Sequence, residues 1–299
     1  MERGNQRTIH KPLNVQRELS LPILLGQKKS NQITTILAYF VLIIAALIVL
    51  FPLVWIALTS IKEPVLAYQI PPKWLFTPTL ENYKQIFRDT PFARYFLNSA
   101  IIALTTTFFA ILFGSFAAYS ISRYKTGGGF FKGWILNNRT MPAIAILIPI
   151  FLLANIFKLF DTYWALIIPY LSFILPFSIW MIISYFDVIP RDMEEAALVD
   201  GATQLQALLY VDMPLAAPGI AATAILSFLF SWNEFLMALI LTGNNTRTLP
   251  IAVSNYLTQR GVQYGPLSAA IVVMIIPVTL LAFSIRGYLV KGLSAGAIK

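Results

Sequence analysis

The stretch SNQITTILAYFVLIIAALIVLFPLVWIALTSI, residues 30–61, contains no aspartate, glutamate, lysine or arginine. An uncharged apolar run of more than ~18 residues is typical of a membrane-spanning helix. The other uncharged runs of comparable length are Tyr95–Ser122, Thr140–Phe157, Thr162–Phe186, Met213–Asn233 and Gly261–Ile285. Backbone polar groups must be paired in hydrocarbon, and the length and lack of alternation of these runs exclude barrel strands. The sequence therefore predicts an all-α integral membrane protein with six transmembrane helices, the fifth continuing to about Thr242.

The composition of the chain is that of a protein embedded in lipid. Of its 299 residues, 58% are hydrophobic and 12% charged, whereas soluble domains carry about 25% charged residues. The absence of cysteine excludes disulfides, thiolate metal sites and cysteine nucleophiles, and the one histidine, His10, lies in a polar tail. The net charge of +9 suits contact with anionic lipid. Nucleic-acid binding is not expected, because it needs basic residues gathered on a soluble face.

Lysine and arginine residues in the loops predict the orientation. Six spans put both termini on one side, which carries thirteen basic residues against eight on the other. Because cytoplasmic loops carry the excess of basic residues, both termini are predicted to be cytoplasmic. The expected parts are a basic cytoplasmic amino tail (1–30) that lacks the apolar core of a signal peptide, a six-helix transmembrane domain (31–290) with a cytoplasmic loop at 187–218, and a cytoplasmic carboxyl tail (291–299).

A charged segment, DMEEAALVDGATQLQALLYVDMP (192–214), lies in the predicted loop between the fourth and fifth spans. Asp192 with Glu195, and Thr203 with Gln206, have the spacing of capping boxes. A short helix is therefore predicted to begin at each pair.

Gly201 separates the two predicted short helices, as the left-handed residue that ends the first. Pro214 and Pro218 are expected to mark the entry into the fifth span. A stiff pair of helices between two spans fits docking on a partner protein, and packing on the inner leaflet is the alternative. The acidic residues disfavour that alternative because the leaflet is itself anionic.

The spacing within this segment resembles the signature of bacterial ABC importer permeases. That signature reads Glu-Ala-Ala, three residues, Gly, nine residues, Ile-x-Leu-Pro. Glu195-Ala196-Ala197, Gly201 and Val211-Asp212-Met213-Pro214 stand at these positions, with valine and methionine as conservative departures. The resemblance implies the type I permease fold in the bacterial inner membrane, with coupling helices seated in a cleft of an ATPase subunit. The residues implied in this contact are Glu194, Glu195, Ala196, Ala197, Asp200, Gly201, Val211, Met213 and Pro214.

Further segments resemble one branch of that family, the carbohydrate-uptake permeases of the maltose type, and in particular its second membrane subunit. They are LENYKQIF (80–87), the pair Asn98-Ser99, FDTYWALIIPY (160–170), SWNEFLMALILT (231–242) and GLSAGAIK (292–299). The resemblance implies uptake of a sugar or oligosaccharide, a companion permease, an extracytoplasmic solute-binding protein, and two cytoplasmic ATPase subunits that bind ATP and Mg²⁺. It also implies that this chain binds no cofactor and catalyses no reaction.

Glu234 is the only acidic residue inside a predicted span, where a charge costs ~2.5–3.5 kcal/mol on insertion scales. With Trp232 and Asn233 it could line a sugar path through aromatic stacking and hydrogen bonds to hydroxyls. The interpretation that we favour is a structural hydrogen bond to a neighbouring helix. A secondary, ion-coupled transporter of a polar solute is the alternative function, which one intramembrane carboxylate supports only weakly. An intramembrane enzyme would need a cluster of ionisable residues.

The remaining polar segments have simpler interpretations. KTGGGFFKG (125–133) is expected to be a flexible inner loop, and no Lys-Ser or Lys-Thr follows its glycines as a nucleotide loop requires. The outer loop 62–94 is either an anchor in the headgroup region or a docking surface for an extracytoplasmic partner. Asn98 and Ser99 are expected to be helix-packing positions.

Overall fold

The computed structural model describes residues 32–137, 143–258 and 261–296. The amino tail predicted for residues 1–30 lies outside these ranges, as do the last three residues of the predicted carboxyl tail. The chain divides into two units, residues 1–53 and 54–299. In the first unit the described residues belong to helix α1 (Gln32–Ser60), whose side chains from 35 to 53 are all exposed. An apolar helix of this kind has to be covered by lipid or by another chain.

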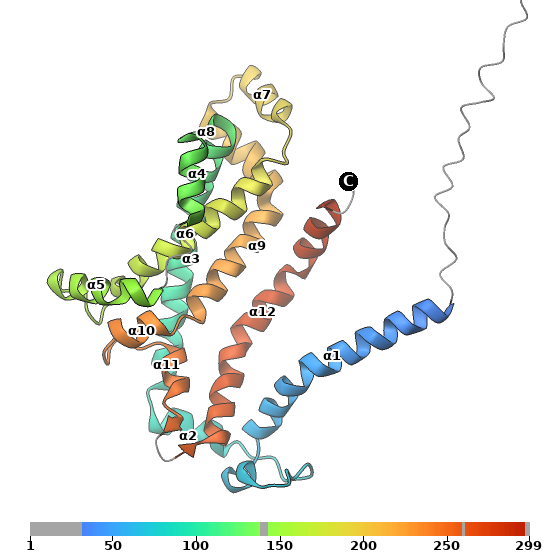
Figure 1. Ribbon diagram of the computed structural model, residues 1–299, viewed down its shortest axis with the longest axis vertical. Coiled ribbons are helices and arrows are strands. Elements are labelled where there is room, and N and C mark those ends of the chain that lie inside the picture. Colours follow the sequence, from blue (N-terminus) through green and yellow to red (C-terminus); the bar gives the residue numbers. More distant parts are fainter. Residues whose placement is uncertain (1–31, 138–142, 259–260, 297–299) are drawn as a thin grey trace, which may run out of the picture. The chain divides into compact units, whose positions relative to one another are not determined.

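The second unit consists mostly of helices (Figure 1). After α1, the elements in chain order are η1 (Pro64–Tyr68), α2 (Glu81–Asp89), α3 (Phe92–Tyr124), α4 (Gly128–Asn137), α5 (Ala143–Ile156), α6 (Trp164–Phe186), α7 (Arg191–Val199), α8 (Gln204–Ala207), η3 (Leu208–Asp212), α9 (Met213–Trp232), α10 (Leu236–Leu241), α11 (Leu249–Ser254), β1 (Leu257–Thr258), β2 (Gly261–Val262) and α12 (Tyr264–Gly296). The two short strands form an antiparallel hairpin, in which Leu257 pairs with Val262. The structure confirms the predicted helical class.

Five helices among the described residues are long and apolar enough to cross a membrane. They are Thr35–Ser60, Phe92–Tyr124, Trp164–Phe186, Gln204–Trp232 and Tyr264–Ser284. The part of the predicted third span that the structure describes contains α5, a helix of 14 residues. At 1.5 Å per residue such a helix covers about 21 Å, less than the ~30 Å of a hydrocarbon core. Residues 140–142 of that predicted span lie outside the described ranges.

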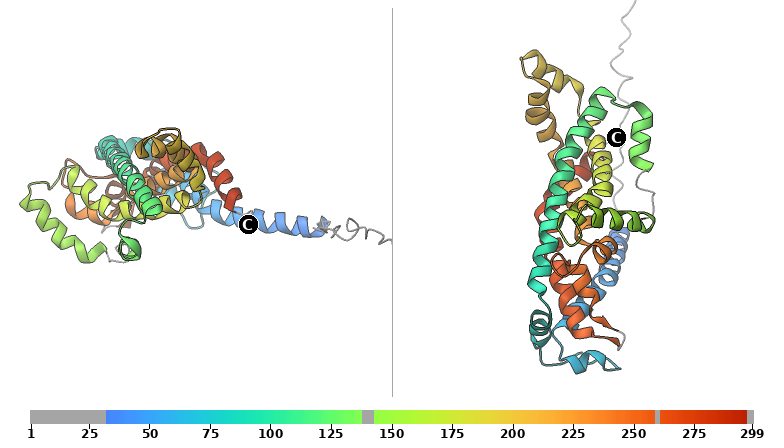
Figure 2. Two further views of the ribbon diagram at one scale, coloured as in Figure 1. Left: turned by 90° about the horizontal axis from the view of Figure 1, so that it is seen from above. Right: turned by 90° about the vertical axis from the view of Figure 1, so that its left-hand side faces the viewer.

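Helices α3, α6 and α9 pack together at the centre of the second unit, and α12 packs along α9 (Figures 1 and 2). A Cβ atom on Gly114 of α3 would lie 3.2 Å from the Cβ atom of Ser178 on α6. The Ser178 hydroxyl lies 3.0 Å from that of Ser227 on α9, and the Trp232 indole donates to the Met274 carbonyl of α12 at 3.1 Å. Small residues thus allow the helices to approach closely, as is usual in membranes.

The glycine-rich segment 125–133 is not the flexible loop that the sequence suggested. A turn occupies its start, with positive φ at Lys125, Gly127 and Gly128 (52°, 74° and 59°). Helix α4 then begins at Gly128 and places the buried Ile135 in a cluster with isoleucines of α6. The expectation was wrong because this packing, remote in sequence, outweighs the low helix propensity of glycine.

The predicted fifth span is interrupted near its end. Helix α9 stops at Trp232, and α10 begins at Leu236 and ends before Thr242, where the span was expected to end. The Glu234 carboxylate accepts the backbone N–H groups of Met237 at 2.9 Å and Ala238 at 3.2 Å. These are two of the N–H groups that a new helix leaves without a partner. Glu234 therefore stabilises a second helix start inside the apolar run.

We expect Gly219→Ala to loosen the contact between α6 and α9. A Cβ atom at this buried position would overlap the ring of Tyr185 on α6, so the ring or the helix has to move. The expected loss is about 1–3 kcal/mol, as for overpacked cores, measured as a lower midpoint of thermal unfolding in detergent. Gly133→Ala on α4, where nothing lies within 4 Å of the added atom, is the matched control. Equal midpoints would contradict the close contact.

Candidate functional site

Helix α7 starts two residues before the position that the capping-box spacing predicted. Its N-cap residue is Pro190 and no side chain caps it, so the predicted Asp192–Glu195 capping box is wrong. Proline fixes φ, and the extended backbone of Pro190 (ψ 135°) lets the helix begin at Arg191. Asp192 then lies in the first turn, where the helix dipole favours its negative charge.

The glycine turn after α7 has the predicted geometry. Gly201 has φ +90°, in the left-handed region. The N–H of Ala202 donates to the carbonyl of Ala197 at 3.0 Å, and the N–H of Gly201 donates to that of Leu198 at 3.1 Å. This pair of bonds is a Schellman motif, which satisfies the last carbonyls of the helix.

The second predicted capping box is confirmed. The helix that it starts was expected to be short, but it continues into the fifth span. Thr203 Oγ1 accepts the N–H of Gln206 at 3.3 Å, and Gln206 Oε1 accepts the N–H of Thr203 at 2.8 Å. Helix α8 then continues through η3, a π-helical turn in which the N–H of Met213 donates to the carbonyl of Leu208, into α9. The wider turn accommodates Pro214, which has no N–H and whose ring would otherwise meet a carbonyl of the preceding turn.

Most residues implied in an ATPase contact are accessible from outside. Glu195, Ala196, Asp200, Gly201 and Pro214 are exposed, and Ala197, Val211 and Met213 are half-buried. Beside them, Val199 and Tyr210 are 87% and 77% exposed. Exposed apolar side chains grouped with polar ones are typical of a surface that another protein covers.

Glu194 differs from these residues because its side chain is buried among charges. Its Oε2 lies 2.9 Å from Nε of Arg123 at the end of α3, and its Oε1 accepts a hydrogen bond from the Tyr119 hydroxyl. Nη2 of Arg123 donates to Oδ1 of Asp212 at 2.6 Å. We call these four residues the Arg123 cluster. No pattern in the sequence indicated that Arg123 and Tyr119 belong to this site.

The three residues considered for a sugar path differ in their surroundings. Trp232 is 1% exposed, and its indole bonds to α12. Asn233 is exposed and donates to the carbonyl of Leu229 at 2.9 Å. Glu234 is half-buried, and besides capping α10 it accepts a hydrogen bond from the Tyr170 hydroxyl of α6 at 2.8 Å. The structural hydrogen bond between neighbouring helices, expected for Glu234, is present.

Asp161, in the loop between α5 and α6, binds the segment that follows α10. Its carboxylate accepts the backbone N–H groups of Gly243 (2.9 Å), Asn245 (3.1 Å) and Thr246 (2.9 Å), and the side chains of Asn245 (2.9 Å) and Thr246 (2.8 Å). Partial burial raises the pKa of Asp161, but the bonds from Thr246, Asn245 and Gly243 outweigh it and hold the pKa below its usual value. We call these four residues the Asp161 clasp.

Helix α3 binds the same segment through the pair Asn98 and Ser99. Asn98 Nδ2 donates to the carbonyl of Asn245 at 2.9 Å, and Ser99 Oγ accepts the N–H of Leu249 at 2.8 Å. The interpretation of this pair as helix-packing positions was therefore incomplete, because their polar atoms hold the loop after α10 and the start of α11 against the helix.

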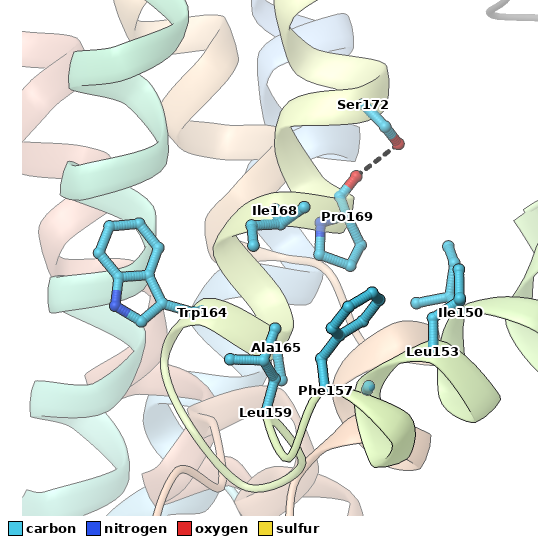
Figure 3. A pocket seen from close by; sticks show the side chains of 10 residues that line it. Ile150, Leu153, Phe157, Leu159, Trp164, Ala165, Ile168, Pro169 and Ser172 are labelled. Carbon is cyan, nitrogen blue, oxygen red and sulfur yellow. Dashed lines mark hydrogen bonds between the residues drawn. The ribbon is translucent and has the colours of Figure 1, made fainter.

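A groove of about 340 Å³ lies between α5 and α6 (Figure 3). Its lining is apolar and includes Phe157, Trp164 and Ile168. The Ser172 hydroxyl at its edge donates to the carbonyl of Pro169 at 2.6 Å. A sugar needs hydrogen-bond partners for its hydroxyls, so the groove suits acyl chains or apolar side chains of another protein instead.

Known proteins resemble the chain in sequence and in fold. Residues 110–295 match the family described as binding-protein-dependent transport system inner membrane component. The sulfoquinovosyl glycerol transport system permease protein SmoH of Agrobacterium fabrum is 38% identical over 84% of this chain and 89% of its own length. The trehalose/maltose transport system permease protein MalG of Thermococcus litoralis is 35% identical over 86% and 94%. A crystallised bacterial ABC transporter involved in the import of the acidic polysaccharide alginate shares the fold, with a TM-score of 0.70, 24% identity, and coverage of 87% of this chain and 98% of its own.

Acid is expected to release the Asp161 clasp. Because the folded-state pKa of Asp161 is depressed, the clasp contributes stability above the unfolded-state pKa of about 3.9. This contribution is lost as the pH falls below that value through the folded-state pKa. Asp161→Asn is expected to cost about 1–3 kcal/mol at neutral pH, measured by thermal unfolding in detergent, and the difference from the unmodified protein should shrink in acid.

Two further variants test this assignment. Gly243→Ala places a Cβ atom 2.7 Å from Oδ2 of Asp161 and should weaken the clasp in the same way. Asp192→Asn, at an exposed carboxylate of α7, is the matched control. A difference between Asp161→Asn and the unmodified protein that stays constant with pH would contradict the assignment.

Proposed function

The chain belongs to the family of binding-protein-dependent transport system inner membrane components, and from this membership we propose that it carries a sugar or an oligosaccharide across the membrane. It is a permease subunit of an ABC importer of the inner membrane, and its task is transport and not catalysis. Membership of the family favours this function over an ion-coupled secondary transporter. Relatives named for the transport of trehalose/maltose and of sulfoquinovosyl glycerol support a carbohydrate cargo.

The coupling segment, α7 to η3, docks on one of two ATPase subunits. Those subunits, and not this chain, bind ATP and Mg²⁺. The observation that carries this assignment is an exposed helix, a Schellman turn at Gly201 and a second helix that runs without a break into α9. When the ATPase pair closes on ATP, the coupling segment moves with it. Because α8 is continuous with α9, the displacement reaches a membrane-spanning helix directly.

The proposed topology has six spans with both termini and α7 on the cytoplasmic side, and α5 belongs to the third span. The domain limits are those expected from the sequence, with tails at 1–30 and 291–299. Within the second unit, α7 and α4 lie near one end of α3 and α2 lies near the other, which supports an assignment of opposite sides (Figure 1). Basic residues gather at the end assigned to the cytoplasm: Arg123 and Lys125 lie at the end of α3, and Arg191 is the first residue of α7. This agrees with the cytoplasmic excess of basic residues.

A companion permease and an extracytoplasmic solute-binding protein complete the importer. The apolar groove between α5 and α6 and the exposed apolar side chains of α1 are surfaces for lipid and for the companion permease. The solute-binding protein docks on the loop that contains η1, where Val65, Ile70 and Leu75 are 75%, 95% and 88% exposed. Asn82 steadies this loop by donating to the carbonyls of Ser60 and Lys62.

Asn233 and Glu234 are the residues that we assign to contact with the cargo. A carboxylate has about four acceptor sites, and Glu234 uses three of them within the chain. One site remains for a sugar hydroxyl, and the exposed Asn233 lies beside it in sequence. The ring of Trp232 is buried and bonded to α12, so it is not available to stack on the cargo.

Glu195→Ala and Gly201→Asp are expected to uncouple transport from ATP hydrolysis. The first removes an exposed charge from the docking surface, and the second forces a side chain into a left-handed conformation that costs about 1–2 kcal/mol. Transport should fall about tenfold. The measurement compares cargo uptake and ATP hydrolysis stimulated by the loaded binding protein, with the complete importer in proteoliposomes.

Gly129→Ala on α4, a position with open space around it, controls for nonspecific effects on insertion and assembly. If both variants retain the uptake and ATP hydrolysis of the unmodified importer, α7 and Gly201 are not the coupling element of this chain.

A further inference from the structure

Arg123 at the end of α3 contacts the coupling segment and its flanks at several points. It pairs with Glu194 in α7 at 2.9 Å and with Asp212 just before α9 at 2.6 Å. Its Nη1 donates to the carbonyl of Ile189, before α7, at 3.2 Å. In return, Nη2 of Arg191 donates to the Arg123 carbonyl at 3.3 Å. One side chain thus joins the entry, the middle and the exit of the segment to α3.

Water is nearly excluded from the two ion pairs of the Arg123 cluster. The side chains of Arg123, Glu194 and Asp212 are 5%, 8% and 0% exposed. Exposed pairs contribute little and are screened by salt, whereas removing one member of a buried pair leaves an uncompensated charge. The planar guanidinium donates to Asp212 through Nη2 and to the Ile189 carbonyl through Nη1, while Nε faces the Glu194 carboxylate, an arrangement that the single charge of a lysine cannot match. The cluster is therefore a strong and directional attachment.

We propose that Arg123 is a positioning residue that fixes α7 to the ends of α3 and α9, so that α7 moves with these helices as one body. This inference rests on the proposed function. α7 is connected to α6 by the turn at 187–190 and to α8 by the turn at Gly201. With the Arg123 cluster intact, α7 cannot pivot about these turns without separating buried charges. A force applied to α7 by an ATPase is then transmitted to the helices and not absorbed by the turns.

The test measures the distance between α7 and α3 in the assembled importer. Because the chain has no native cysteine, spin labels can be placed at Asp192→Cys on α7 and Phe116→Cys on α3, both exposed positions. In the otherwise unmodified importer we expect a narrow distance distribution that a non-hydrolysable ATP analogue does not change. Arg123→Met should broaden the distribution and reduce the cargo moved per ATP about tenfold, while the ATPase subunits still co-purify.

Conservative variants separate positioning from simple stabilisation. Glu194→Gln keeps the size of the side chain and an acceptor for Tyr119, and should broaden the distribution less than Arg123→Met. Arg123→Lys keeps the charge, but it should fail to restore the narrow distribution because one ammonium cannot reproduce the bonds to Asp212 and Ile189 and the ion pair with Glu194 together. If Arg123→Met does not fold, Glu194→Gln and Arg123→Lys carry the test.

A narrow distribution and normal cargo per ATP in these variants would overturn the inference, even if their thermal stability is lower. If the unmodified chain does not assemble with ATPase subunits, the proposed function fails. The label distances in the full-length chain then still decide whether Arg123 fixes α7 to α3.

Discussion

In hydrocarbon a backbone N–H or C=O group has no water to bond, and this constraint accounts for the way the break between α9 and α10 is built. Where α9 ends, the Glu234 carboxylate accepts the first N–H groups of α10. Before Pro214, which has no N–H, the helix widens into η3 and bonds five residues back. At these two places a departure from a regular helix brings a local replacement for the missing bond.

Directional polar contacts are concentrated toward the ends of the central helices. The Arg123 cluster lies at the carboxyl end of α3. Near the amino end of α3, Asn98 and Ser99 hold the segment after α10. Between them, α3, α6 and α9 meet mainly through small and apolar residues, with the Ser178–Ser227 contact as a polar exception. Packing of this kind has little directional preference. The contacts at the helix ends are consequently more specific than those at the middles, which suits the displacement of α9 that we propose for transport.

The features that the sequence predicted correctly are those determined within a few residues. Uncharged runs indicated the long spans because hydrocarbon thickness requires length, and Gly201 and the Thr203–Gln206 pair indicated a turn and a helix start. Asp192 was misassigned as a cap because the neighbouring Pro190 determines where the helix begins. The Arg123–Asp212 pair spans 89 positions, and no local pattern distinguishes that arginine from any other basic residue at the end of a span. Its partners become apparent only when α3 and the coupling segment are brought together.

A sugar that crosses the membrane carries many hydroxyl groups, and a hydroxyl moved into an apolar environment without a partner costs about 2–7 kcal/mol. Glu234 retains about one acceptor site, and the Ser172 hydroxyl beside the groove between α5 and α6 is already bonded to Pro169. These groups of the described residues satisfy only a small part of what a sugar needs. On the proposed function, the companion permease faces α5, α6 and the α9–α10 break and supplies the remaining partners. Cargo selection is then a joint property of two permeases, so a substitution at Glu234 should affect the break between α9 and α10 more than the identity of the sugar.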